Sequence, residues 1–127
     1  MKYICLCYYD IDTAANLSPE EAAKIGPACK PHDEILKATG KLLVHASLSA
    51  PETWSYFVPK DGKPQHVQGR YLATPHQAGA FFIVDAETEG EALRVASKHA
   101  AANYGERLGF AVEVRACDSY DAYEVVA

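Results

Sequence analysis

Apolar and polar positions alternate along this chain with two different periods, one typical of strands and one typical of helices. A near-continuous apolar run at residues 2–9 and another at 79–86 predict strands that are covered on both faces. Alternation at residues 41–49 and 110–116 predicts two further strands, and residues 54–59 a third. Helical periodicity follows Ser18 and Thr88. The predicted order is strand, helix, strand, strand with an inserted hairpin or loop, strand, helix, strand.

The first predicted helix has clear start and stop residues. Ser18 is placed to act as N-cap, and Glu21 three residues later completes a capping box. Gly40 is placed to end the helix in a left-handed conformation. Two prolines lie between these ends, and each removes a backbone donor, so we expect a kink near Gly26. The second helix begins at Thr88 with another capping box and is expected to end between residues 99 and 102.

A histidine lies on the apolar stripe of the first helix. The stripe repeats at intervals of four, three and four residues and consists of Ile25, Cys29, His32 and Leu36. His32 is therefore expected to point inward, where it would act as a general acid or base or serve as a hydrogen-bonded structural residue. Its neighbour Asp33 lies about 100° further round the helix and is expected to face solvent.

The strand at residues 41–49 has one apolar and one mixed face. Its apolar face, expected to meet the helices, consists of Leu42, Val44, Ala46 and Leu48. The other face carries His45, which is expected to lie opposite the helices, either as a polar residue of an interface or as part of a ligand cavity.

These elements predict an α+β fold, a ferredoxin-like sandwich in which an antiparallel sheet carries two helices on one face. Because several strands are apolar on both faces, the uncovered face is expected to pack against a second copy in a symmetric homodimer. Residues 1–116 form the predicted domain, and residues 117–127 a C-terminal tail.

Composition excludes several classes of protein. The net charge of -5 over 127 residues, without a basic run, argues against binding to nucleic acid or to an anionic membrane surface. The apolar start is too short to span a membrane. Four cysteines, mostly within apolar segments, suit a reducing compartment, and we expect a cytoplasmic protein. Neither Cys5 and Cys7 nor the histidines at 66, 76 and 99 have metal-site spacing, so no metal and no other cofactor is expected.

Several stretches in matching order resemble the YCII-related family, most closely its DGPF-domain branch. They are residues 1–6, 17–21, 30–42, 79–84, 91–94 and 113–115. The resemblance implies a ferredoxin-like fold that dimerises into an α/β barrel, and an active site around a helix histidine, here His32, commonly paired with an aspartate. Most members have no assigned reaction, and one is a dehydrochlorinase acting on a chlorinated hydroxyquinol-type substrate.

The chain departs from this branch at its name-giving motif. Where the branch has Asp-Gly-Pro-Phe, this chain reads Gln68-Gly69-Arg70-Tyr71. Loss of the carboxylate removes a group that could orient an imidazole, whereas Arg70 adds a charge that could hold an acidic ligand. Gln68, Arg70, Tyr71 and His45 are therefore the predicted substrate-binding residues; for Arg70 and Tyr71 the alternative is a surface loop.

Two functions remain open from the sequence. The first is an acid/base enzyme of lyase or hydrolase type that uses His32 on a small acidic or aromatic molecule. The alternative is a non-catalytic module of the same fold that binds a small molecule or a protein, which the loss of the motif aspartate favours. A monooxygenase of the dimeric α/β-barrel kind would need a cavity on the open face of the sheet around His45.

Overall fold

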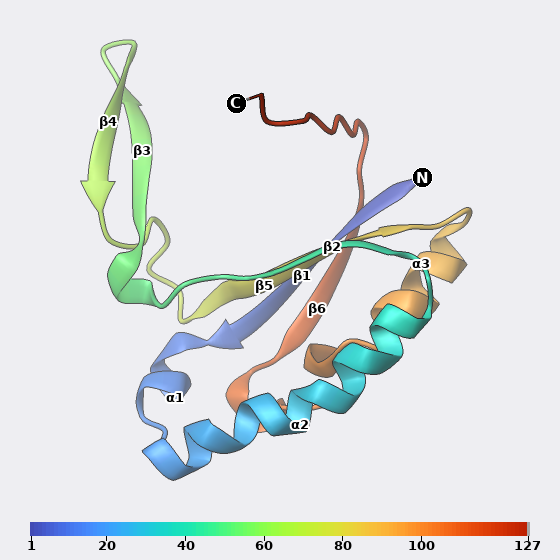
Figure 1. The fold of residues 1–127 in the computed structure, drawn as a ribbon. Coiled ribbons are helices and arrows are strands. Elements are labelled where there is room, and N and C mark those ends of the chain that lie inside the picture. Colours follow the sequence, from blue (N-terminus) through green and yellow to red (C-terminus); the bar gives the residue numbers. More distant parts are fainter. Residues whose placement is uncertain (127) are drawn as a thin grey trace.

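The computed structural model describes residues 1–126 (Figure 1). Four strands form an antiparallel sheet in the order β2-β5-β1-β6. They are β1 (Lys2–Asp10), β2 (Leu42–Ser47), β5 (His76–Asp85) and β6 (Ala111–Ala116). The α-helices are α1 (Ile11–Ala15), α2 (Pro19–Ala38) and α3 (Glu89–Ala96), and the short 3₁₀ helices are η1 (Pro51–Thr53), η2 (Ala100–Ala102) and η3 (Glu106–Leu108). Residues 117–126 form neither helix nor strand.

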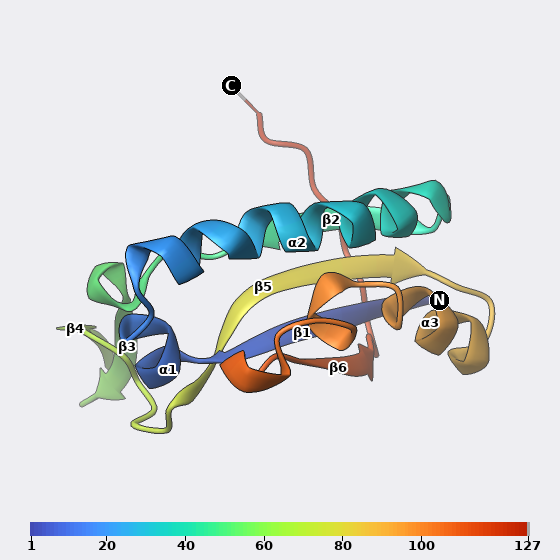
Figure 2. The same cartoon turned by 90° about the horizontal axis from the view of Figure 1, so that it is seen from below.

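The two longer helices, α2 and α3, lie on the same face of the sheet (Figure 2). Together with the strand order, this arrangement is consistent with the predicted ferredoxin-like α+β fold. The sheet is open and does not close into a barrel within one chain. Within the described residues no helix combines the length and the apolar character needed to cross a bilayer.

The hydrophobic core lies between the sheet and α3. Alternate residues of the two central strands point into it, and α3 adds small side chains from the other side. Leu36 of α2 also enters it, and its best-buried members are Tyr3, Cys5, Cys7, Leu36, Phe82, Val84, Ala86, Ala92, Val95 and Ala96. The strands predicted at residues 2–9 and 79–86 are thus present, and within one chain the core covers one face of each; cover on the second face stays a prediction.

The predicted faces of β2 are wrong beyond Leu42. Leu42 pairs with Val84, but the next pair in register is Val44 with Ile83, so one residue is inserted into the ladder between them. This β-bulge reverses the alternation of the rest of the strand. His45 consequently pairs with the buried Phe82 and points to the helix-covered face, opposite to the expectation.

Helix α2 begins as predicted but does not break. The Ser18 hydroxyl accepts a hydrogen bond from the Glu21 amide at 3.1 Å, and the Glu21 carboxylate accepts one from the Ser18 amide at 3.1 Å. Both internal prolines lie within one continuous helix of 20 residues, so the two helical pieces expected on either side of Gly26 form a single element, and the kink near Gly26 stays a prediction. Gly40 ends the segment with φ +72°, as expected of a left-handed cap.

The other helix ends earlier than predicted. The Thr88 side chain caps α3 by accepting from the Glu91 amide at 3.1 Å, but α3 stops at Ala96. The backbone at His99 is extended, and His99 becomes the N-cap residue of η2.

The segment between β2 and β5 forms a separate hairpin that projects from the body of the molecule (Figure 1). β3 (Ser55–Lys60) pairs with β4 (Lys63–Gln68) and with no strand of the main sheet. The predicted turn at Asp61 and Gly62 is confirmed, with φ values of 52° and 75°.

Candidate functional site

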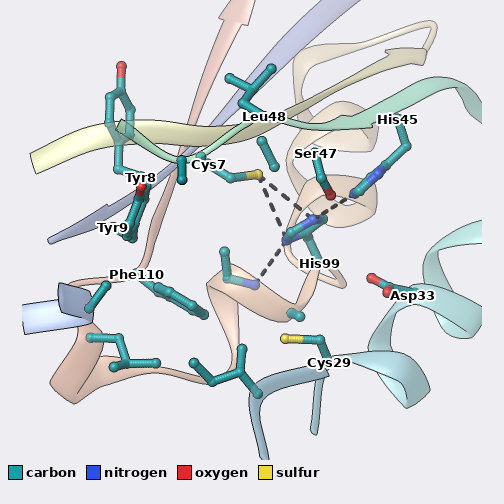
Figure 3. A pocket seen from close by; sticks show the side chains of 18 of the residues that line it. Cys7, Tyr8, Tyr9, Cys29, Asp33, His45, Ser47, Leu48, His99 and Phe110 are labelled. Carbon is teal, nitrogen blue, oxygen red and sulfur yellow. Dashed lines mark hydrogen bonds between the residues drawn. The ribbon is translucent and has the colours of Figure 1, made fainter. Parts of the chain in front are cut away.

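A cavity of about 470 Å³ lies between α2 and the sheet (Figure 3). This volume is within the range of roughly 300–1,000 Å³ that is typical of small-molecule sites. Its walls come from the ends of β1, β2 and β5, from α2 and from the η2 region. Most of its lining is apolar, and its polar side chains include Asp33, His45, Ser47 and His99.

The cavity exists because α2 does not pack directly on the sheet. Leu36 is the one fully buried residue of this 20-residue helix, and the main packing partner of α2 is η2. The part of α2 before Leu36 therefore spans an open space above the strands. Ile25, Cys29 and Asp33, which follow one another at intervals of four residues, face this space.

His99 is the buried polar residue of the site. Its ring stacks on Phe82, with centroids 4.9 Å apart and planes 6° from parallel. The Sγ atom of Cys7 lies 3.9 Å from Nδ1 and 3.8 Å from Nε2 of His99, so the sulfur contacts the ring as a whole rather than one nitrogen. These contacts fix the plane of the imidazole.

Two hydrogen bonds determine which nitrogen of His99 carries the proton. The Ala101 amide donates to Nδ1 at 2.9 Å, because His99 caps η2 with its side chain. A neutral imidazole that accepts at Nδ1 has its proton on Nε2. His99 Nε2 lies 3.1 Å from Nε2 of His45, so His99 donates and His45 accepts, which leaves the proton of His45 on Nδ1.

The electrostatics of the site favour the neutral form of His99. Burial lowers the pKa of His99, and the nearby imidazoles of His45 and His32 lower it further, whereas the Asp33 carboxylate acts in the opposite direction. Protonation at Nδ1 would also place two donors against each other at the Ala101 amide.

Asp33 completes a group with the two histidines. One oxygen of Asp33 and one nitrogen from each of His45 and His99 lie within 4.8 Å of one another. Asp33 is half-buried, His45 is exposed and His99 is buried, so the group reaches from the core to the mouth of the cavity. No hydrogen bond or ion pair within residues 1–126 involves the Asp33 carboxylate.

Asp33, His45 and His99 contain the donor atoms that zinc and other divalent metals use, so they are the residues that could hold a metal. A metal ligand atom needs a free lone pair, however, and Nε2 of His99 carries a proton that points to His45. Moving that proton to Nδ1 would break the hydrogen bond from the Ala101 amide. The hydrogen bonds of the pair therefore suit proton donation better than metal ligation.

Two aromatic rings form the wall across the cavity from these residues, and glycines make room for them. A Cβ atom added to Gly79 would lie 2.7 Å from the ring of Tyr9. Gly105 has φ +84°, and its position also leaves no room for a Cβ beside the ring of Phe110. Both rings line the cavity.

The cysteines of the site differ in their surroundings. Cys7 is buried in the core, and burial, with a smaller effect of Cys5, raises its pKa to about 12. Cys29 is half-buried in the cavity wall, where burial and then Asp33 raise its pKa. Cys7 therefore packs as an apolar group, and Cys29 is the cysteine of α2 that a ligand would meet.

The residues predicted from the sequence are not brought together. His45 lies in the cavity, but on the face opposite to the one expected. His32 is half-buried on α2 and does not line the cavity, whereas its neighbour Asp33, expected to face solvent, does. Gln68 ends β4, and Arg70 and Tyr71 follow it outside the cavity; Tyr71 is 68% exposed and packs edge-on against Tyr56.

Asp33 and His99 were not predicted as members of one site. His99 lies far from α2 in the sequence, and only the early end of α3 turns its ring toward the sheet. The spacing of Ile25 and Cys29 did contain a sign of Asp33, because a second step of four residues reaches it.

The chain is a small α+β protein with a ligand-sized site. Its antiparallel sheet has the ferredoxin-like strand order and two helices on one face, and the cavity beneath α2 contains a polar group. A family model described as the YCII-related domain matches residues 1–116, and the chain belongs to this family. The match ends with the last strand of the sheet. No curated protein matches the chain.

Proposed function

We propose that this YCII-related protein is an acid/base enzyme, of lyase or hydrolytic type, acting on a small and largely apolar molecule held in the cavity. The observation that carries the proposal is the hydrogen bond between His45 and His99 beside Asp33, in a cavity whose walls are otherwise mostly apolar. Titratable groups brought together in a partly water-excluded cavity are typical of catalytic sites.

Each member of the group has a role that its hydrogen bonds allow. The Asp33 carboxylate accepts a proton from the substrate and, once protonated, is the acid that returns it to the leaving group. His45 keeps its Nδ1 proton and donates a hydrogen bond from it to a developing oxyanion. His99 is a positioning residue, because its Nε2 proton holds His45 in the donating tautomer. His32, predicted as the catalytic residue, acts on the site through its proximity to His99.

An aromatic or other apolar substrate suits this cavity better than an acidic one. No lysine or arginine lines the cavity, and Arg70, the cation predicted to hold an acidic ligand, lies outside it. An anionic substrate would therefore meet Asp33 without a compensating charge.

The alternative is a binding module without catalysis, and it is supported by the lack of a free base on His45 and His99. Nδ1 of His99 accepts from the Ala101 amide, and Nε2 of His45 accepts from His99, so neither imidazole has a free lone pair to act as a base. If Asp33 does not transfer protons, the site can bind a ligand but has no base to act on it.

Deuterium exchange in D₂O separates these two functions. The probes are small aryl ketones, with and without an amino group, whose carbon-bound protons next to the carbonyl are acidic. NMR should show enzyme-dependent exchange, which falls by about 100-fold or more in the isosteric variant Asp33→Asn and less in His45→Gln. His66→Gln, on the hairpin outside the cavity, is the control and should exchange at the wild-type rate. Binding of a probe without exchange would support the binding module.

We also propose a homodimer through the uncovered face of the sheet. The register of β1, β2 and β5 turns Ile4, Leu6, Val44, Phe81 and Ile83 to this face. Val44 is 41% exposed in the single chain. Sedimentation equilibrium should give twice the mass of the chain for wild type and a shift toward the single-chain mass for Val44→Lys; a wild-type monomer at the concentrations used for assays would contradict the dimer.

A further inference from the structure

The charges that line the cavity are unbalanced. Asp33 is the only aspartate or glutamate among the lining residues, and no lysine or arginine accompanies it. Lys24 and Arg107 line a neighbouring groove together with Glu21 and Glu106. That groove is balanced, so it does not supply a cation to Asp33.

The two histidines of the cavity do not supply the missing charge either. His45 could become a cation only by taking a proton on Nε2, where the Nε2 proton of His99 already points at 3.1 Å. His99 could become one only at Nδ1, where the Ala101 amide donates at 2.9 Å. Burial also lowers the pKa of His99. The hydrogen-bond chain from Ala101 through His99 to His45 thus leaves neither ring a free nitrogen lone pair beside Asp33.

The opposite wall of the cavity is suited to the apolar or aromatic body of a ligand. Aromatic rings pack well against such groups, and Tyr9 and Phe110 both line the cavity (Figure 3). Their rings are held beside Gly79 and Gly105, positions that leave no space for a side chain. Burial raises the pKa of Tyr9, and Glu52, which does not line the cavity, raises it further.

We propose that the cavity selects a positively charged ligand, a small protonated amine with an apolar or aromatic body, whose ammonium group lies against Asp33 and whose body packs against Tyr9 and Phe110. The inference rests on the proposed function in that it concerns the same cavity. It adds the charge of the ligand, which neither the fold nor the family gives.

Three probes of nearly equal size test the charge preference: benzylamine, benzyl alcohol and benzoate. Their dissociation constants are measured near pH 7.5 by NMR titration of the labelled protein, with Asp33→Asn as the test variant. Glu34→Gln is the matched control, because Glu34 is the next residue of α2, is exposed and does not line the cavity. Wild type should bind benzylamine most tightly, and Asp33→Asn should weaken benzylamine about tenfold or more while leaving benzyl alcohol within about twofold. Glu34→Gln should bind all three probes as wild type does.

The other outcomes separate failure of this inference from failure of the proposed function. Binding of benzoate or benzyl alcohol as tightly as benzylamine, or an amine affinity unchanged in Asp33→Asn, would overturn the charge preference and leave the cavity as a ligand site. Failure of all three probes to perturb the signals of cavity residues would overturn both. A zinc titration tests whether the missing cation is a metal ion. Stoichiometric zinc binding that requires Asp33, His45 and His99 would overturn the preference for an amine.

Discussion

The Nε2 atoms of His45 and His99 lie 3.1 Å apart although the two residues are 54 positions apart in the chain. Two local irregularities make this contact. The bulge in β2 turns His45 to the helix-covered face, and the end of α3 at Ala96 leaves His99 as the cap of η2. A regular β2 or a longer α3 would separate the two rings, so the site depends on where these elements depart from regularity.

The burial of His99 predicts a pH dependence of stability. Because burial lowers the pKa of His99 in the folded protein, the unfolded chain takes up this proton at a higher pH, near its ordinary value of about 6.5. The stability that His99 contributes is therefore complete above about pH 6.5 and is lost as the pH falls through the folded pKa. Urea unfolding should show that wild type loses more stability between pH 7.5 and 5 than His99→Gln does.

The same variant should also be less stable at pH 7.5, by about 1–3 kcal/mol, because it loses the stacking on Phe82 and both hydrogen bonds of the ring. His66→Gln, on the exposed hairpin, is the control for the pH series and should follow wild type. Equal acid sensitivity of wild type and His99→Gln would show that His99 is not the group responsible.

Replacement of Gly79 should damage the cavity wall. A Cβ at this position would lie 2.7 Å from Cδ1 of Tyr9, so Gly79→Ala must displace the ring or the strand. We expect a loss of about 1–3 kcal/mol of unfolding free energy and weaker binding of any cavity ligand. Gly26→Ala is the matched control: Gly26 has open space around it within α2, and alanine there should stabilise by about 0.5–1 kcal/mol. Loss of stability by Gly26→Ala but not by Gly79→Ala would contradict these placements.

The two central strands could be predicted from sequence, because each is an uninterrupted apolar run. Which face of each strand enters the core could not, since both faces are apolar; the structure turns Tyr3, Cys5, Phe82 and Val84 inward. The ends of α2 were predictable for a similar reason: Ser18, Glu21 and Gly40 act through contacts within a few residues of each other. The two prolines do not end the helix, since both lie within one continuous element.

The site was less predictable because it depends on register and on contacts between distant segments. Alternation in β2 is read correctly only if the bulge after Leu42 is known, and no residue there marks it as a glycine or proline would. The apolar stripe of α2 includes His32 and predicts that His32, not Asp33, points inward. That prediction assumes a packed core beneath the whole helix, whereas α2 meets the core only at Leu36 and faces a cavity over much of its length.

Thiol labelling offers an independent check of burial. Burial raises the pKa of Cys5 and of Cys7 to about 12, so at pH 8 only on the order of one molecule in ten thousand carries either thiolate. Both should resist a thiol reagent until the protein unfolds. Cys29, in the cavity wall, should react slowly, and a bound ligand should slow it further. Mass spectrometry of digested, labelled protein gives the rate at each site, and rapid labelling of Cys7 in the folded protein would contradict the core described for β1.

The hydrogen-bond chain from Ala101 through His99 to His45 is the central claim, and nitrogen NMR of the histidine side chains near pH 7.5 tests it most directly. Long-range proton–nitrogen spectra distinguish protonated from unprotonated ring nitrogens, and His45→Gln and His99→Gln assign the signals. The account predicts that His99 is neutral with its proton on Nε2 and that His45 is neutral with its proton on Nδ1. A His99 protonated at Nδ1, or a doubly protonated His45 beside Asp33, would contradict the chain, the roles assigned to the two histidines and the preference for a cationic ligand.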